Sequence, residues 1–182
     1  GVSTVMDALA GRTSLEITAP GVGIREDRIS SLGWLRGYGR VCPVMDADIL
    51  LSPTIEADSD QFEVVRLLGV DILSDRPFRD YELVNEEIPG RTTTQEFLSL
   101  LTDPYAVVLT DSFTRRHALT VDDSVTMQVG DRVVLLRIAG ILGNEGPASV
   151  LNGNFALMDI AAAQWVLGRL GQVGRIDIRL AD

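Results

Sequence analysis

Two glycines follow a strand-like run and precede a helix-like one, as they do in dinucleotide-binding proteins. Residues 14–18 alternate polar and apolar, and Gly21 and Gly23 come directly after them. Asp46 lies 23 residues beyond Gly23, near the distance expected of an acid that binds the ribose. Glu26, however, replaces the third glycine of the fingerprint, and a carboxylate at that helix start would repel a pyrophosphate. A tight turn is favoured, and an oxidoreductase using Gly21 and Gly23 stays as an alternative.

The one cysteine and the one histidine are the next candidates, because together they could form a nucleophile and its base. Cys42 lies in an apolar strand-like run, where we expect a buried and inert thiol. His117 follows Arg115 and Arg116 on a short helix, which predicts a solvated face with ion-paired arginines. A Ser–His–Asp triad would also need His117, and the GxSxG elbow is missing. We therefore expect no catalytic residue.

Acidic residues alternate in two places: Asp46 and Asp48, then Glu56, Asp58 and Asp60. An EF-hand loop needs a glycine at its sixth position and a glutamate at its twelfth, and neither cluster supplies them. The prediction is a solvated loop in each case, with no metal and no cofactor. A single cysteine and a single histidine also exclude an intrachain disulfide and a Cys/His zinc cluster.

The composition narrows the class of protein further. The 182 residues include 16 basic and 26 acidic ones, a net charge of −10, and all the basic residues are arginine. Without lysine, neither Schiff-base chemistry nor a P-loop can operate, and the acidic balance argues against nucleic-acid binding. The longest run without charge has 13 residues, whereas a membrane-spanning helix needs roughly 20. Because the chain begins with Gly1, we expect it to belong to a longer protein.

These residues need a mixed α/β framework to position them. Apolar periodicity, capping residues and turn signals predict helices at 2–10, 25–36, 94–101, 111–118 and 160–170, and strands at 14–18, 40–52, 62–69, 105–110, 124–129, 132–142, 154–158 and 175–180. Gly130-Asp131 predicts a hairpin turn, and Asp159 is a helix cap. The Pro- and Gly-punctuated stretch 71–92 is a candidate linker or boundary.

In this order, the blocks resemble a known family, the MacB-like periplasmic core domain of FtsX-superfamily ABC transporter permeases. The segments that carry the resemblance are VVRLLGVDIL, RPFRD, DPYAVVLTDSFTRRHAL, VGDRVVLLRIAGIL and FALMDIAAAQWVLGRLGQVGRIDIRLAD. Each motif is degenerate, so their order over most of the chain carries the specificity. Residues 75–100 depart from the family pattern by being longer and more polar.

The resemblance implies an α+β fold in two parts. A porter-like α/β subdomain would comprise 1–71 and 148–182, and a small α/β subdomain with a β-hairpin would be inserted at 72–147. In such permeases this domain is an extracytoplasmic loop between the first two transmembrane helices. Residues 2–10 would continue the first helix, and 176–182 would lead back to the second.

The function implied is non-catalytic. The domain would convert ATP-driven motion of the membrane part into movement of a substrate or partner protein outside the membrane. Implied partners are its own transmembrane helices, a cytoplasmic ATP-binding subunit or domain, a periplasmic adaptor or substrate protein and a second permease subunit, with no nucleic acid. We expect the hinge or partner contact at Asp75, Arg76, Pro77, Phe78, Pro89 and Gly90. A free-standing secreted interaction domain is the remaining alternative.

Overall fold

The computed structural model describes residues 15–19, 23–55, 61–73, 93–143 and 154–180. In chain order the elements are β1 (Leu15–Thr18), β2 (Ile24–Arg25), η1 (Glu26–Gly37), β3 (Gly39–Ser52), β4 (Glu63–Val70), α2 (Thr93–Thr102), β5 (Ala106–Thr110), α3 (Asp111–Arg116), β6 (Ser124–Val129), β7 (Arg132–Leu142), β8 (Phe155–Asp159), α5 (Ile160–Val166), β9 (Gln172–Val173) and β10 (Arg175–Leu180).

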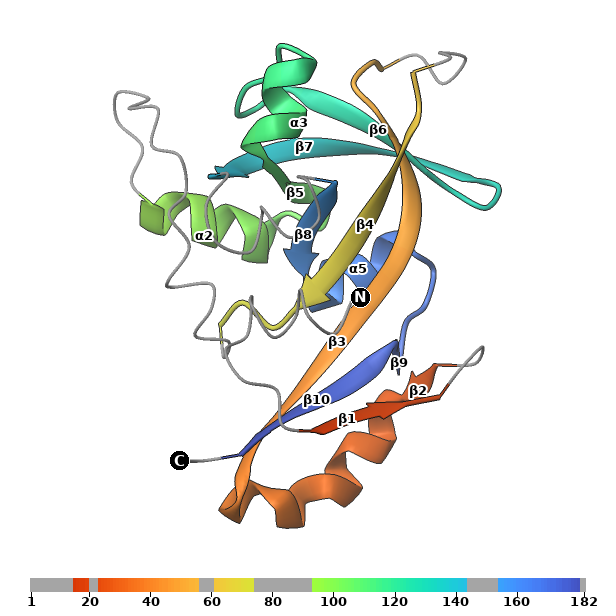
Figure 1. Cartoon of the computed structure of the whole chain (residues 1–182), viewed down its shortest axis with the longest axis vertical. Coiled ribbons are helices and arrows are strands. Elements are labelled where there is room, and N and C mark those ends of the chain that lie inside the picture. Colours follow the sequence, from red (N-terminus) through yellow and green to blue (C-terminus); the bar gives the residue numbers. More distant parts are fainter. Residues whose placement is uncertain (1–14, 20–22, 56–60, 74–92, 144–153, 181–182) are drawn as a thin grey trace.

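Eight of these strands form one mixed sheet, in the order β1-β10-β3-β4-β8-β5-β7-β6 (Figure 1). The far strand β6 also pairs with β3, so six strands close into a ring. The pairs β4–β8 and β5–β7 are parallel, and the others are antiparallel. We call β3, β4, β8, β5, β7 and β6 the β-ring. The two remaining strands, β1 and β10, extend the sheet beyond it.

The longest strand, β3, belongs to both parts of the sheet. Its first half pairs with β10, from Gly39 to Val44, and its second half pairs with β4 and, at its end, with β6. Its residues alternate between two faces, as in any strand. Met45, Ile49 and Leu51 point into the main core and are at most 2% exposed. Because β3 has 14 residues, its first part can pair with β10 and its later part with the strands of the β-ring.

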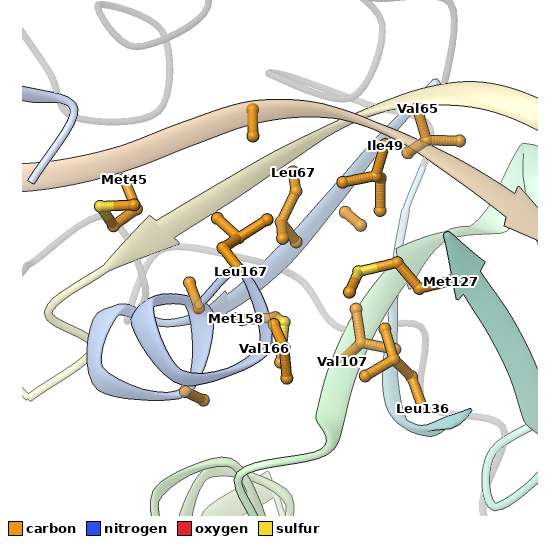
Figure 2. Packing of buried hydrophobic residues seen from close by; sticks show 14 of the residues in the cluster. Met45, Ile49, Val65, Leu67, Val107, Met127, Leu136, Met158, Val166 and Leu167 are labelled. Carbon is orange, nitrogen blue, oxygen red and sulfur yellow. The ribbon is translucent and has the colours of Figure 1, made fainter. Parts of the chain in front are cut away.

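The main core fills the space between the β-ring and helix α5. Figure 2 shows Ile49, Leu67 and Met127 pointing toward one another from separate strands, with Val166 and Leu167 approaching from the helix side. Because these side chains are aliphatic and almost fully buried, they supply most of the hydrophobic stabilisation on this side of the sheet.

A second, smaller core lies on the opposite face of the same strands. In β8, Ala156 belongs to the main core, whereas Phe155 and Leu157 belong to the second one. Leu100 of α2 covers this second face. The central strands are therefore buried on both faces, which explains why β5 is apolar along its whole length apart from Thr110.

Segment 26–37 is helical, as the sequence predicts for 25–36, but it forms a 3₁₀ helix. Its apolar residues Ile29, Leu32 and Leu35 repeat every third position and all pack on the main core. A 3₁₀ helix has three residues per turn, so this spacing aligns them on one side. The hydroxyl of Ser30 also donates to the carbonyl of Asp27, three residues earlier.

Helix α5 begins as predicted and ends earlier. The Asp159 side chain accepts a hydrogen bond from the Ala161 N–H and caps the helix. The helix ends because Gly168 takes a left-handed conformation, with φ of +67°. Leu170, predicted to lie on the apolar face, is instead 65% exposed. At Gly69 of β4, a Cβ would lie 2.5 Å from the Ala163 Cβ, so the helix packs directly on that glycine.

The fold is α+β, and the predicted β6–β7 hairpin has the expected bounds. Each strand predicted between 14 and 180 is confirmed to within a residue or two, while the short strands β2 and β9 were not predicted. The helix expected at 2–10 lies outside the described residues. The division into 1–71 with 148–182 and 72–147 stays a prediction; β8 and β5 pair across it, so both parts would share one sheet.

Candidate functional site

An apolar pocket of about 390 Å³ opens where strands β4 and β8 end. Its walls come from the end of α2, the turn before β5, the end of β8, helix α5 and the segment after that helix: Leu100, Leu101, Pro104, Asp159, Ala161, Ala162, Trp165 and Leu170. Strands β4 and β8 are parallel, and ligands of open α/β sheets commonly bind outside the carboxyl ends of such strands. This volume lies within the range of small-molecule sites. We call it the α2–α5 pocket.

One ionisable side chain lines this pocket, the carboxyl of Asp159. Burial raises the pKa of Asp159 above its ordinary value of 3.8, and the carboxylate of Asp71 acts in the same direction. Hydrogen bonds from the backbone N–H groups of Ala161, Ile72 and Ile160 oppose the shift. Among the described residues no arginine is paired with Asp159, so its charge is balanced by backbone dipoles alone.

One aromatic side chain, Trp165, lines the pocket. Trp165 is 47% exposed, and its indole N–H donates to the hydroxyl oxygen of Tyr105 over 3.4 Å. Leu170 and Tyr105 are also exposed. The sequence does not predict this pocket, because it predicts a helix that continues to residue 170. The signal available was the Gly168 and Gly171 pair, which ends the helix early and turns Leu170 outward.

A partly buried group of charges links β3, β4 and β10. Arg175 and Asp177 on β10 form an ion pair with 3.2 Å between Nε and Oδ1, and their side chains are only 4% and 1% exposed. Arg66 of β4 pairs with Asp46 at 3.1 Å and with Asp48 at 2.9 Å. Arg175 Nη1 lies 3.6 Å from Asp46, which joins the two sets. We call these five residues the arginine–aspartate cluster.

A glycine leaves room for one member of this cluster. The N–H of Gly174 donates to the Val44 carbonyl over 2.9 Å. A Cβ on Gly174 would lie 2.8 Å from Asp46 Oδ1 and 3.2 Å from the Asp46 backbone nitrogen. The position of Asp46 therefore depends on the absence of a side chain at residue 174.

His117 belongs to a second polar group, and the prediction of a solvated face for it is wrong. Its Nε2 lies 2.8 Å from Glu63 Oε1, and its side chain is 19% exposed. The Phe113 ring packs against the imidazole, with 4.7 Å between centroids. Arg116 donates to Glu63 at 3.1 Å and to Asn154 at 3.3 Å. Glu63 thus draws the end of α3 onto the start of β4.

The arginines beside His117 behave as predicted. Arg116 pairs with Glu63, and Arg115 Nε lies 2.9 Å from Asp111 Oδ2, four residues earlier on α3. Cys42 is buried in β3, also as predicted. It pairs with β10, whereas Glu63, the partner of His117, pairs with Leu51. Nine residues of strand, about 30 Å, separate the two positions, so they form no dyad.

The remaining sequence candidates fall into two groups. Asp46 and Asp48 were expected in a solvated loop, which is wrong: they lie within β3 and pair with Arg66. Glu56, Asp58 and Asp60 lie outside the described residues. So do the hinge candidates Asp75, Arg76, Pro77, Phe78, Pro89 and Gly90. Within the described part of the chain, no group of three metal-ligating side chains gathers, and no helix is long and apolar enough to cross a membrane.

The geometry also disfavours the dinucleotide alternative. Strand β1, which leads to Gly21 and Gly23, is an edge strand whose four residues are all exposed, whereas a nucleotide-binding sheet places this strand at its centre. Gly23 has a φ of +74°, as a tight turn requires, and Asp46, the expected ribose ligand, is held by arginines. Gly21 lies outside the described residues.

Solved structures with a similar fold are extracytoplasmic parts of ABC-type transporters. The extracellular domain of the transporter YknZ from Gram-positive bacteria matches with a TM-score of 0.58 and 11% identity, over 92% of this chain and 84% of that one. The periplasmic region of MacB from Actinobacillus actinomycetemcomitans matches with a TM-score of 0.56 and 13% identity, over 98% and 80%. No protein-family model and no curated protein matches the sequence.

The chain therefore has the fold of an extracytoplasmic domain of an ABC-type transporter. More particularly, it has the fold of a MacB-like periplasmic core domain, which confirms the resemblance of its sequence blocks.

Proposed function

We propose that this chain is the extracytoplasmic domain of an ABC transporter permease, anchored through its own transmembrane helices. In this role it does no catalysis itself. It couples ATP-driven motion of the membrane part to a substrate or partner protein outside the membrane. The ATPase is a separate cytoplasmic subunit or domain, which is consistent with a chain that has no lysine for a P-loop.

The observation that carries this proposal is the pairing of β1 with β10. Leu15, at the start of β1, pairs with Ile178, near the end of β10. The chain therefore enters and leaves the sheet at one end (Figure 1). A domain inserted between two neighbouring membrane helices needs this arrangement, because both connections must reach the same membrane surface.

Strand β3 supports the mechanical part of the proposal. It begins opposite Leu180 at this same end and continues for 14 residues into the β-ring. A strand of that length spans roughly 45 Å. Because its hydrogen bonds to β10, β4 and β6 follow one another, a displacement of the β1–β10 end would be passed to the β-ring by one continuous element.

We keep residues 75–92 as the proposed hinge or partner contact. The test replaces them with a short Gly/Ser linker in a full-length permease that contains this chain, reconstituted with its ATP-binding subunit. We expect ATP hydrolysis to continue while substrate movement or partner binding is lost. A matched control inserts the same linker at the Gly130–Asp131 turn. Unchanged transport in the 75–92 variant would make the assignment of the hinge wrong.

The role as a permease domain has its own test. A parent protein of this kind must contain apolar segments of roughly 20 residues directly before residue 1 and after residue 182. Protease protection in intact cells should then place residues 15–180 outside the membrane. A parent without such segments, or a domain reached only from the cytoplasm, would refute the proposal independently of the hinge.

A further inference from the structure

The α2–α5 pocket combines an apolar surface with one carboxylate that has no cationic partner among the residues that the structure describes. Apolar groups of α2 and α5 make most of its walls, and the only ionisable group among its lining residues is Asp159. Three other partly or fully buried carboxylates in the described part of the molecule, Asp46, Asp103 and Asp177, each pair with an arginine. Asp159 differs from these three because its partners are backbone N–H groups.

The charged residue near Asp159 is another acid, which makes the pocket still more favourable for a cation. Asp71 is also acidic, and it acts on Asp159 in the same direction as burial does. A cation that entered the pocket would relieve both effects, while an anion would be repelled. Trp165 adds a second attraction, because an indole ring interacts with cations more strongly than other aromatic side chains do.

We propose that the α2–α5 pocket binds a small apolar amine in its protonated form. The ammonium group would lie at the Asp159 carboxylate, and the hydrocarbon part would contact Leu100, Leu101 and Trp165. The shape supports a small ligand: a volume of about 390 Å³ is enough for an amine with a phenyl or short alkyl group. This site goes beyond the proposed function and does not depend on it.

The test uses the 182-residue chain with Trp34→Phe, because Trp34 is the only other tryptophan and is 68% exposed. Trp165 fluorescence then reports on the pocket alone. The probes are 4-phenylbutylamine, which is protonated at pH 7, and the neutral 4-phenylbutan-1-ol as its matched control. We expect saturable binding of the amine with a Kd about fivefold below that of the alcohol, which is the upper end for a partly exposed ion pair.

Two variants assign this preference to a residue. Asp159→Asn keeps a good helix cap and removes the charge, so the amine should fall to the affinity of the alcohol while the alcohol is unaffected. Asp131→Asn, in the β6–β7 turn, removes the same charge elsewhere and should leave the preference intact. The proposal is overturned if the amine does not saturate Trp165, if amine and alcohol bind equally to the parent chain, or if Asp159→Asn retains the preference.

Discussion

The two halves of strand β3 are stabilised by different kinds of buried contact. The half that pairs with β10 lies beside the arginine–aspartate cluster, where Arg175 and Asp177 are almost fully buried. The half inside the β-ring is surrounded by aliphatic side chains such as Leu67, Met127 and Leu136. Aliphatic contacts are non-directional, whereas an ion pair needs both partners in place.

This difference shows which contacts fix the strand register in each half of β3. In the β-ring, the main core on one face and the second core on the other fix which side chains point inward. Beyond the ring, β1 is fully exposed, whereas Ile176 and Ile178 of β10 are buried in the main core. A slip of one residue between β10 and β3 would move Arg175 and Asp177 to the opposite face, away from Asp46. The cluster therefore adds a directional constraint on register to the apolar contacts of Ile176 and Ile178.

The largest effect is expected from breaking the buried ion pair. Arg175→Met should lower the free energy of unfolding by about 3–5 kcal/mol, because Asp177 keeps its charge in a buried position. The double variant Arg175→Met with Asp177→Leu should recover much of this loss, since an apolar pair of similar size removes both buried charges together. Urea titrations measure all three proteins. A single variant within 1 kcal/mol of the parent would contradict the distinction between the halves.

Removing a side chain from the β-ring should cost somewhat less. Leu136 is fully buried, so Leu136→Ala should lower the free energy of unfolding by about 2–5 kcal/mol through lost burial and a residual cavity. The neighbouring Leu135 is 48% exposed and is the matched control. Leu135→Ala should change stability by about 0.5 kcal/mol or less. If both variants lost the same free energy of unfolding, burial of Leu136 in the main core would not be what stabilises β7.

Gly174→Ala tests the connection between the two halves. The added Cβ would press on Asp46 and on the Val44 carbonyl, and we expect a loss of about 1–3 kcal/mol. Gly37→Ala is the control, because a Cβ at Gly37 meets nothing within 4 Å. Thermal unfolding of the two variants should separate them, and identical midpoints would mean that Asp46 can move without cost.

The smallest effect is expected in how stability depends on pH through Asp159. This carboxyl belongs neither to the arginine–aspartate cluster nor to the core of the β-ring. Its pKa is raised in the folded protein, so the folded state binds the proton more tightly than the unfolded one. Its contribution to stability is therefore greatest below about pH 4 and is lost as the pH rises through the folded pKa. Asp159→Asn lacks this titration and should gain stability relative to the parent over that interval. Urea unfolding midpoints are measured for both proteins at several pH values in this interval. A constant difference between the two midpoints would contradict the prediction.

Much of the fold could be predicted from the sequence because its strands are strongly patterned. Strand β5 is almost entirely apolar, and β6 alternates between polar and apolar residues. Gly130-Asp131 marks the turn of the hairpin between β6 and β7. Thr126 departs from this pattern: it is 2% exposed on the face predicted to be polar, because its hydroxyl donates to the Thr54 carbonyl over 2.7 Å. Local patterns do not reveal such a partner 72 residues away.

The sites were harder to predict for the same reason. Asp46 and Asp48 read as solvated acids until β4 brings Arg66 beside them, and His117 reads as exposed until β4 places Glu63 against it. The α2–α5 pocket also needs two helices on opposite faces of the sheet to meet at its end. The surroundings of the two acids, of His117 and of the pocket all result from tertiary contacts. The spacing of residues in the sequence gives no information about such contacts.

Closure of the β-ring has a further consequence for how the protein behaves at high concentration. Because β6 returns to β3, β1 is the one strand of the described eight-stranded sheet that has a single neighbouring strand. Unpaired edges are templates for adding strands from other molecules, and short edge strands reduce this risk. With only four residues, including the charged Glu16, β1 offers few backbone groups for such pairing. The sheet is thereby protected against edge-to-edge aggregation among the strands that the structure describes.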